Sequence, residues 1–301
     1  MSLLVLGTVA LDDVKTPSGV KKNMLGGSAA HFAMSARLFD DVHVVGVVGK
    51  DFPKVHMDFL KRKGVNIASL TVAAGETFRW AGEYREEDLN TAITHDTRLG
   101  VLSDYAPQLN EQQRNCSHVF LANLAPTVQE KMLDLMRSPS FVGVDTMNLW
   151  INTSLKYLRR ILKRADLLVL NDGEARMLTG ERNAVAAARV LRSMGPKIVV
   201  VKKGEHGVYV YGGNFEFGYP AFPVLRVVDP TGAGDTFAGG LFGYITKCRR
   251  CDEKTMRRAA VYGTVLASFN VEGFGMGKTA PLTMREVDRR WKEYQQFCAL
   301  A

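Results

Sequence analysis

Cysteine is scarce in this chain, and long apolar runs are missing. Its 301 residues include four cysteines, which are too few and too scattered for a framework of disulfide bonds. Cys248 and Cys251 form one Cys-x-x-Cys pair, without the second pair that a four-sulfur zinc site needs. No run of about eighteen apolar residues occurs, and the N-terminus lacks a basic leader segment. We therefore expect a soluble, cytoplasmic protein without a structural metal or a membrane-spanning segment.

The chain is basic, with a formal net charge of +8, but this charge is not concentrated in one place. Lysine and arginine occur in short clusters spread along the sequence, mostly at helical spacing. This distribution is typical of solvated helix faces and not of a single basic binding surface. We expect no nucleic-acid partner, whereas the overall positive field favours an anionic ligand such as a nucleotide.

Apolar runs of strand length recur along the chain, with helical stretches between them. This alternation predicts an α/β fold, in which a mostly parallel sheet has helices on both faces. The length and the 46% hydrophobic content suit one domain spanning residues 1–301. The expected strands are residues 3–6, 42–48, 119–122, 141–144, 167–170, 198–201 and 224–228.

A polar residue lies at or just past the carboxyl end of five of these expected strands. Open α/β sheets bind their ligands at this edge. One such residue is expected by chance, but five together predict a binding site. They are Asn123, Asp145, Asn171, Lys202 and Asp229.

Two segments, about residues 9–24 and 77–99, do not follow the alternation. The second has strand-like stretches on either side of a polar, acidic turn, and the first is similar. Both patterns predict short antiparallel strands. We expect them to form a small β lid over the strand ends.

Residues 227–240 carry the strongest chemical signal in the chain. They read as a strand end, a turn of small residues and the start of a helix. Gly232, Ala233 and Gly234 have little side chain, so their N–H groups at a helix start can converge on an anion. Asp235 follows in the first helical turn, where the helix dipole favours an ionised carboxylate. Such a carboxylate can accept a proton from an attacking hydroxyl.

This segment resembles the second signature of the ribokinase family, the PfkB-type carbohydrate kinases, which reads Asp-Thr-x-Gly-Ala-Gly-Asp. Pro230 stands where Thr is common, and Pro suits an extended residue before a turn. The resemblance implies a ribokinase-like fold and phosphorylation of a primary hydroxyl by ATP with Mg²⁺. It also implies that Asp235 is the catalytic base and that residues 232–234 form the anion hole. In this family the lid covers the substrate and often joins two copies, so a homodimer is expected.

Other stretches resemble the substrate-binding positions of the family. Gly26 and Gly27 match its first signature, in which two glycines let the backbone close on the sugar, and His31 stands where Asn is usual. Asp12 matches an Asp that accepts hydrogen bonds from sugar hydroxyls, and the adjacent Asp13 is a competitor for this role. The expected substrate residues are Asp12, Gly26, Gly27, His31 and, from its strand-end position, Asn123.

The resemblance also implies sites for the nucleotide and for cations. Asn171 and Glu174 match the Asn-x-x-Glu motif of the family, which organises Mg²⁺ and phosphate, usually through water. Gly204 and Gly207 keep the spacing of its nucleotide loop, with Lys202 where Thr is common. The expected nucleotide residues are Asn171, Lys202, Gly204, Gly207 and, beside adenine, Tyr262. The expected ligands of a monovalent cation such as K⁺ are Asp229, Thr231 and carbonyls of residues 271–275.

Two other glycine patterns do not indicate a different enzyme class. Residues 275–279 end like a Walker A motif, but Glu272 stands where its first glycine is required. Gly232 and Gly234 begin like a dinucleotide fingerprint, but Phe237 occupies the position of the third glycine. We expect neither a P-loop ATPase nor a dehydrogenase.

We interpret the chain as an ATP-dependent kinase for a primary hydroxyl of a sugar. The alternative is an adenosine-type nucleoside kinase, in which Phe78 and Trp80, on one face of an expected lid strand, stack on the base. These side chains equally suit lid packing, and the residues expected to bind hydroxyls favour the sugar. A sensor without catalysis is a third hypothesis, which the presence of Asp235 with an intact anion hole disfavours.

Overall fold

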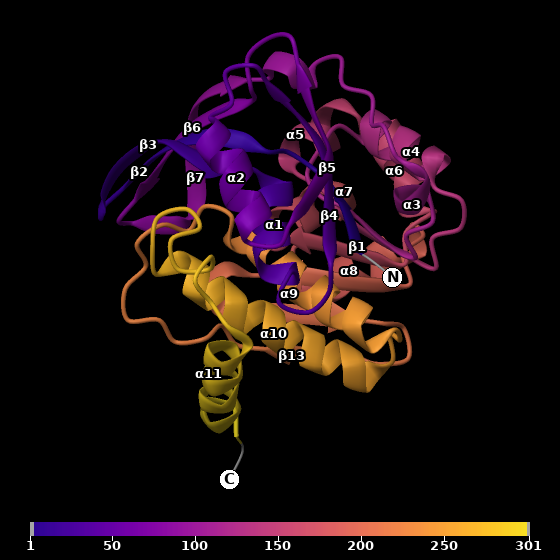
Figure 1. Cartoon of the computed structure of the whole chain (residues 1–301). Coiled ribbons are helices and arrows are strands. Elements are labelled where there is room, and N and C mark those ends of the chain that lie inside the picture. Colours follow the sequence, from indigo (N-terminus) through magenta and orange to yellow (C-terminus); the bar gives the residue numbers. More distant parts are fainter. Residues whose placement is uncertain (1–2, 300–301) are drawn as a thin grey trace.

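The computed structural model describes residues 3–299, and it contains one large and one small β-sheet (Figure 1). The strands are β1 (Leu3–Leu6), β2 (Ala10–Thr16), β3 (Gly19–Gly26), β4 (Val42–Gly49), β5 (Asn66–Ala73), β6 (Arg79–Arg85), β7 (Asp88–Arg98), β8 (His118–Leu121), β9 (Phe141–Asp145), β10 (Leu167–Asn171), β11 (Ile198–Lys202), β12 (Val208–Tyr211) and β13 (Glu216–Tyr219). The α-helices are α1 (Ser28–Ala36), α2 (Lys54–Arg62), α3 (Glu111–Arg114), α4 (Pro126–Leu135), α5 (Asn148–Thr153), α6 (Leu155–Leu162), α7 (Asp172–Thr179), α8 (Ala184–Ser193), α9 (Ala233–Cys248), α10 (Glu253–Val271) and α11 (Met284–Phe297). Two short 3-10 helices are η1 (Gly100–Leu102) and η2 (Gly204–His206).

The large sheet has the strand order β13-β12-β11-β10-β9-β8-β1-β4-β5. All neighbours from β11 to β5 pair in parallel, whereas β12 and β13 extend the β11 edge in antiparallel. The predicted α/β fold with a mostly parallel sheet is confirmed. One expected strand is wrong: residues 224–228 are irregular, because the N–H of Val228 donates to the carbonyl of Val271, at the end of a helix, and Leu225 is fully exposed.

Alternate side chains of a central strand enter different hydrophobic cores. In β10, Leu167 and Val169 pack in the core that contains residues of α1, α9 and α10. Leu168 and Leu170 pack in the core that contains residues of α6, α7 and α8. All four side chains are buried completely. Burial on both faces of the sheet explains why the strands read as continuous apolar runs.

The small sheet has the order β3-β2-β6-β7 and is built from the two segments predicted as a lid. β2 with β3 and β6 with β7 form antiparallel hairpins, and β2 joins β6 in parallel. The register pairs Asp12 with Trp80 and Val14 with Gly82, so these four residues share one face of the sheet. We call it the inner face of the lid, because Asp12 and Val14 on it are buried.

Helix α9 lies in direct backbone contact with two other helices. A Cβ atom on Gly239 would be 2.2 Å from the carbonyl oxygen of Phe32 in α1, and Gly240 approaches α10 closely in the same way. The hydroxyl of Ser35 in α1 donates to the carbonyl of Thr236 in α9 at 2.8 Å. Because its residues here are small, α9 packs closely between α1 and α10. This packing fixes the position of the N-terminus of α9.

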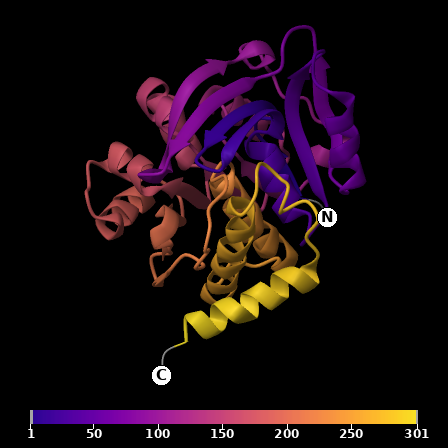
Figure 2. The ribbon, with the colours of Figure 1, turned by 90° about the vertical axis from the view of Figure 1, so that its left-hand side faces the viewer.

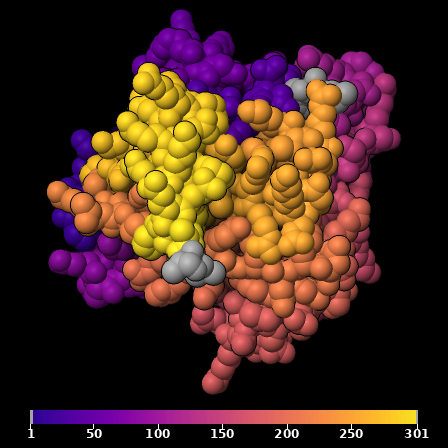
Figure 3. All heavy atoms as spheres, turned by 90° about the horizontal axis from the view of Figure 1, so that it is seen from below, coloured from indigo at the N-terminus to yellow at the C-terminus, as the bar shows by residue number. Residues whose placement is uncertain are grey.

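The last helix, α11, crosses the lower surface of the molecule beside α10 (Figures 2 and 3). Val287 and Tyr294 are its buried side chains, and they share a hydrophobic cluster with Phe269 of α10. Neither of these helices, nor any other helix within residues 3–299, is long and apolar enough to cross a membrane.

We predict that Gly239→Ala destabilises the protein, although Ala is favoured over Gly inside a helix by about 1 kcal/mol. The added methyl group has no space against α1, and overpacking of this kind costs about 1 to 3 kcal/mol or more. Urea denaturation should show a lower free energy of unfolding for Gly239→Ala than for the wild type. Gly218→Ala in strand β13 is the control, because its Cβ would be 3.3 Å from the Val208 carbonyl and needs a shift of only a few tenths of an ångström. Equal stability of the two variants would contradict the proposed packing constraint.

Candidate active site

The turn before α9 presents backbone N–H groups beside the end of β11. Gly232 has a φ of 73°, and a Cβ atom there would be 2.4 Å from the His31 ring, so only glycine fits. The N–H of Ala233 donates to the carbonyl of Pro230 at 3.1 Å and closes the turn. The N–H groups of Gly232 and Gly234 have no acceptor within residues 3–299. Two of the three N–H groups predicted for the anion hole are therefore available to an anion, and that of Ala233 is engaged.

His31 supports this turn from behind. The residue is on α1 with 2% of its surface exposed, and its side chain interacts with Asn270. Burial lowers the pKa of His31, so the imidazole is neutral near pH 7. Because Gly232 covers the ring, His31 contacts the anion-binding turn, and the placement gives no support to the expected contact with substrate hydroxyls.

Asp235 lies in the first turn of α9, where the sequence analysis places the base. Burial, and next the charge of Asp145, raises the pKa of Asp235 to about 7, while the charge of Lys202 opposes this rise. Desolvation thus outweighs the helix dipole, which alone would keep the carboxylate ionised. A carboxyl group with a pKa near neutrality is suited to accept a proton from a hydroxyl.

Asp12 points into the site, and its neighbour Asp13 does not. A Cβ atom on Gly26 would be 1.8 Å from Oδ2 of Asp12, so the glycine leaves the space that this carboxylate occupies. The N–H of Gly27 donates to the same carboxylate, and burial raises the pKa of Asp12 to about 7. The Asp13 carboxylate instead accepts from the exposed N–H of Asn23 at 2.7 Å. Of the two competitors, the structure places Asp12 at the site.

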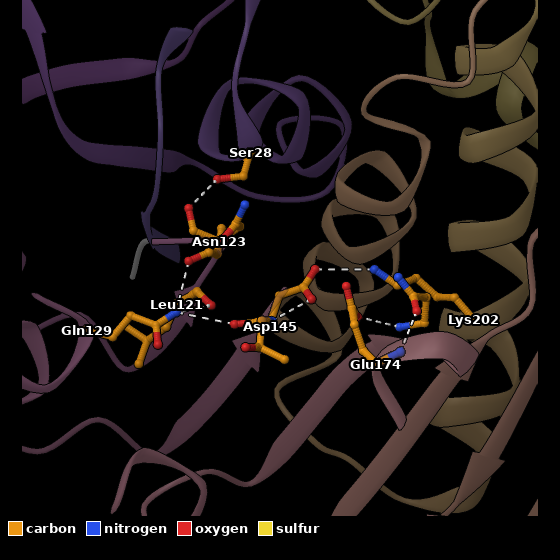
Figure 4. A network of polar contacts seen from close by, with 10 residues as sticks. Ser28, Leu121, Asn123, Gln129, Asp145, Glu174 and Lys202 are labelled. Atoms are coloured by element: carbon orange, nitrogen blue, oxygen red, sulfur yellow. Dashed lines mark hydrogen bonds and ion pairs between the residues drawn. The ribbon is translucent and has the colours of Figure 1, made fainter. Parts of the chain in front are cut away.

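Asn123 follows β8, lies beside Ser28 (Figure 4), and is held by residues of α1 and α5. Its carbonyl accepts from the hydroxyl of Ser28 at 3.1 Å, and its side-chain oxygen accepts from the indole N–H of Trp150 at 2.8 Å. Gln129 fixes this edge of the sheet, because its amide donates to carbonyls at the end of β8 and to that of Asp145. The side-chain NH₂ group of Asn123 has no acceptor among the residues that the structure describes, so it is available as a donor to a ligand.

Lys202 is a buried cation among carboxylates (Figure 4). Its Nζ atom is 3.3 Å from Oδ2 of Asp145, and the two side chains are 17% and 5% exposed. Although burial lowers the pKa of Lys202, the charges of Asp145 and Glu174 raise it above its ordinary value. The ammonium group also lies against the anion-binding turn, since a Cβ atom on Gly234 would be 3.0 Å from Nζ. Lys202 is therefore placed to meet a phosphate group at this turn.

Asn171 and Glu174 cap the start of α7 reciprocally. Oε2 of Glu174 accepts from the N–H of Asn171, and the side chain of Asn171 accepts from the N–H of Glu174, both at 2.8 Å. Burial and the charge of Asp145 raise the pKa of Glu174 to about 7. No cluster of three or more His, Cys, Asp or Glu side chains able to hold a metal occurs within residues 3–299. Mg²⁺ needs only one or two carboxylates when it keeps its waters, so Glu174 and Asp145 fit this ion.

Asp229 is fully buried without a cationic partner. Its carboxylate accepts from the N–H groups of Thr231 and Gly275, each at 2.9 Å, and no cationic side chain of the described chain lies within ion-pair distance. A buried carboxylate of this kind favours a cation beside it. One expected carbonyl ligand, that of Val271, is already engaged, because it accepts two N–H groups. The carbonyl of Thr231 accepts the amide of Asn270, whereas the hydroxyl of Thr231 has no hydrogen-bond partner within residues 3–299. The side chain of Asp229 is the group that best fits a monovalent cation.

The loop after β11 is compact and contains the two glycines predicted to bind nucleotide. The N–H of Gly207 donates to the carbonyl of Gly204 at 3.1 Å, and that of Lys203 donates to the carbonyl of Gly207 at 2.8 Å. Both glycines have positive φ angles, 55° for Gly204 and 92° for Gly207. We call residues 204–207 the nucleotide loop.

Tyr262 is not brought to these groups. Its ring packs against Tyr244, with centroids 4.7 Å apart, and against Trp291 of α11. Its hydroxyl is 3.2 Å from the Asp288 carboxylate, to which it donates. The side chain belongs to the packing of α9, α10 and α11, so the expected contact with adenine has no support in this placement.

The sequence analysis did not single out Tyr84, which the structure brings to the site from the lid. Tyr84 follows Gly82 by two residues in β6, and its phenol lies near Thr231, whose hydroxyl has no hydrogen-bond partner within residues 3–299. Burial, with smaller effects of the charges of Asp229 and Asp12, raises the pKa of Tyr84 to about 12. The alternation from Trp80 to Tyr84 was the available signal, since both residues fall on one face of a strand.

Known sequences place the chain among kinases. The model of the pfkB family of carbohydrate kinases matches residues 4–282. A cytidine kinase of Thermococcus kodakarensis is 32% identical over 260 residues, which cover 84% of this chain and 91% of that protein. A nucleoside kinase of Methanothermobacter thermautotrophicus is 27% identical over 302 residues, which cover 95% and 94%.

Solved structures show the same fold. The nucleoside kinase of Methanocaldococcus jannaschii, an archaeal member of the ribokinase family, superposes with a TM-score of 0.77 and 21% identity, covering 97% of this chain and 98% of that one. A putative ribokinase II of E. coli, in complex with ATP and Mg²⁺, gives a TM-score of 0.79 at 19% identity, covering 97% and 99%. The chain belongs to the pfkB family of carbohydrate kinases and is an ATP-dependent kinase with a hydroxyl group as acceptor.

Proposed function

We propose that this kinase phosphorylates a primary hydroxyl of the sugar in a nucleoside, in preference to a free sugar. The observation that carries the proposal is the flat placement of the Trp80 indole on the inner face of the lid, next to the strand of Asp12. The preference for a free sugar in the sequence analysis rested on the residues expected to bind hydroxyls and on the lack of residues that clearly account for a base. Trp80 supplies such a surface.

Gly82 gives the Trp80 ring its orientation. A Cβ atom on Gly82 would be 2.2 Å from Cζ2 of the indole, so the ring lies across the backbone of its own strand. The indole N–H donates to the hydroxyl of Thr94 on the neighbouring strand at 3.2 Å, which fixes the ring further. A flat indole held in this way offers a π-face on which a base can stack. Asp12, on the adjacent strand, is then in position to accept hydrogen bonds from the ribose hydroxyls.

The relatives support this choice of substrate. The two curated proteins described above are named for kinases of cytidine and of nucleosides. The aminoimidazole riboside kinase of Salmonella enterica, solved with its riboside and an ATP analogue, has the same fold at a TM-score of 0.76. A ribose that carries a ring at its anomeric carbon is common to these acceptors.

The mechanism follows from the charges at the strand ends. Asp235 accepts the proton as the acceptor oxygen attacks the γ-phosphorus of ATP. The N–H groups of Gly232 and Gly234, together with the Lys202 ammonium, stabilise the negative charge of the transferring phosphoryl group. Glu174 and Asp145 would hold Mg²⁺ through water, and this ion would neutralise charge on the phosphates.

Trp80→Ala should raise the Kd of the preferred nucleoside about tenfold or more, because stacking on an aromatic side chain contributes roughly 1 to 3 kcal/mol. Calorimetric titration measures this effect, after a coupled ADP-release assay over nucleosides and free sugars has identified the acceptor. Gly82→Ala should cause a similar loss, because the new methyl group displaces the intact ring. Trp80→Phe, which keeps a ring, should retain most of the affinity. Turnover of free pentoses that matches that of nucleosides would contradict the proposal.

Asp235→Asn should lower kcat by roughly 10² to 10⁴ and leave the Kd of ATP within a few fold, since the base acts only in the chemical step. In the wild type the carboxyl group is protonated below its pKa of about 7. The kcat/KM for the acceptor should therefore decrease as the pH is lowered through neutrality. Asp13→Asn, on the exposed side of the lid, is the control that should keep wild-type rates. Retention of more than a tenth of kcat by Asp235→Asn would exclude Asp235 as the base.

We also propose that K⁺ binds beside Asp229 and Thr231 and supports the turn that precedes α9. Replacement of K⁺ by tetramethylammonium, which is too large for such a site, should lower both kcat/KM and the melting temperature of the wild type. Asp229→Asn removes the buried charge, so its melting temperature should not respond to K⁺. An equal response of the two proteins to K⁺ would show that the ion acts elsewhere.

A further inference from the structure

The tip of the hairpin β6–β7 contacts the nucleotide loop. The side-chain NH₂ group of Asn90 donates to the Glu205 carboxylate at 3.2 Å, and the N–H of Glu205 donates to the side-chain oxygen of Asn90 at 3.3 Å. One amide thus makes two reciprocal hydrogen bonds with a residue 115 positions further along the chain. Asp88 shapes the tip, because its carboxylate accepts from the N–H of Asn90 at 2.8 Å.

The contact also involves the first glycine of the loop. Gly204 has a φ of 55°, and a Cβ atom there would be 2.1 Å from Oδ1 of Asn90. On the other side of the loop, a Cβ atom on Gly207 would be 2.0 Å from the carbonyl oxygen of Tyr219 at the end of β13. The loop is therefore held between the hairpin tip and the edge of the large sheet. Movement of the hairpin therefore changes one of the two contacts that set the conformation of the nucleotide loop.

The same hairpin reaches the acceptor side of the site through Tyr84. The parallel pairing of β2 with β6 ends at Lys15 and Glu83, so residues 84–90 extend beyond β2. We call residues 84–90 the arm. Its base carries Tyr84, whose phenol lies near Thr231 in the turn before α9 and near the carboxylates of Asp229 and Asp12. Its end carries Asn90, which contacts the nucleotide loop. One short segment therefore spans both substrate sites.

We propose that the arm couples the two sites, with Tyr84 as a residue of the acceptor site and Asn90 as a positioning residue for the nucleotide loop. A ligand that orders the arm from one end removes part of the ordering cost for a ligand at the other end. By linkage, each substrate then raises the affinity of the other by the same factor. The proposal rests on the proposed function, because it assumes that the acceptor and the nucleotide occupy these two places.

Calorimetry on the full chain tests the coupling directly. The Kd of ADP is measured with and without a saturating concentration of the nucleoside that is phosphorylated fastest. For the wild type the nucleoside should lower this Kd by about 5-fold to 20-fold, within the range common for coupled sites. In Asn90→Ala the ratio should fall towards one, while the Kd of the nucleoside alone stays within about twofold of the wild type. His95→Ala is the matched control, because it removes a contact with Glu83 inside the same hairpin and none with the loop.

Tyr84→Phe tests the other end of the arm. Loss of the hydroxyl should raise the KM of the acceptor several-fold and leave the KM of ATP unchanged, whereas a purely structural role would shift both or neither. A wild-type ratio of one, or a ratio that Asn90→Ala leaves unchanged, would overturn the coupling.

Hydrogen exchange separates failure of this inference from failure of the proposed function, because it needs no acceptor. In the presence of ADP alone, Asn90→Ala should speed exchange of the amide of Glu205, and His95→Ala should not. Equal exchange in the two variants would overturn the role of Asn90 even if the enzyme phosphorylates nucleosides. Faster exchange in Asn90→Ala would support that role even if no nucleoside is an acceptor.

Discussion

The close approach of α9 to α1 is the constraint on which the rest of the site depends. Gly239 allows backbone contact between the helices, and the hydroxyl of Ser35 ties α1 to the carbonyl of Thr236 in the first turn of α9. With the helix start fixed, Gly232 rests on the His31 ring and the turn keeps its positive φ. The N–H groups that face an anion are therefore oriented before any ligand arrives. Such preorganisation is what electrostatic stabilisation of phosphoryl transfer requires.

The ionisable side chains at the strand ends are mostly acidic, whereas the chain as a whole is basic. The protein has a formal net charge of +8, yet its site gathers three carboxyl groups, those of Asp145, Glu174 and Asp235, around the ammonium group of Lys202. Burial raises the pKa of Asp12, Glu174 and Asp235 to about 7, so the free site holds its carboxyl groups near the balance between both protonation states. Binding of a metal ion, of a nucleotide or of the acceptor substrate changes that balance. The site is thus arranged to respond to its own substrates.

In the proposed function, acceptor selection belongs to the lid and not to the large sheet. The proposed base and anion-binding turn are at the start of α9, whereas Trp80, Gly82 and Tyr84 come from one lid strand. Gly82 has no side chain, so the indole of Trp80 can lie flat across the strand. The arm then carries the same strand on to the nucleotide loop. The proposed coupling depends on this arrangement, in which a single hairpin carries Tyr84 at one end of the arm and Asn90 at the other.

The sequence by itself determined the mostly parallel sheet and the strands of the small sheet, and it predicted which carboxylate is the base. Apolar runs such as residues 167–170 need burial on both faces, and that pattern is local. The run at residues 224–228 has the same composition, but the fold leaves it outside the sheet, because Val228 and Asp229 donate to the carbonyl of Val271 at the end of α10. The composition of five residues cannot predict to which distant carbonyl group their N–H groups will donate.

Only the tertiary structure decided which predicted residues meet. It turned Tyr262 towards Trp291, placed His31 behind the anion-binding turn and engaged the N–H of Ala233 with Pro230. It also brought in Tyr84, which lies near Thr231, and Asn90, which bonds to Glu205, each more than a hundred residues away in the sequence. The sequence motif at residues 232–235 could be recognised because its turn and its carboxylate are adjacent in the sequence. The lid contacts were not, because they depend on how the small sheet packs against turns and loops that lie far away in the sequence.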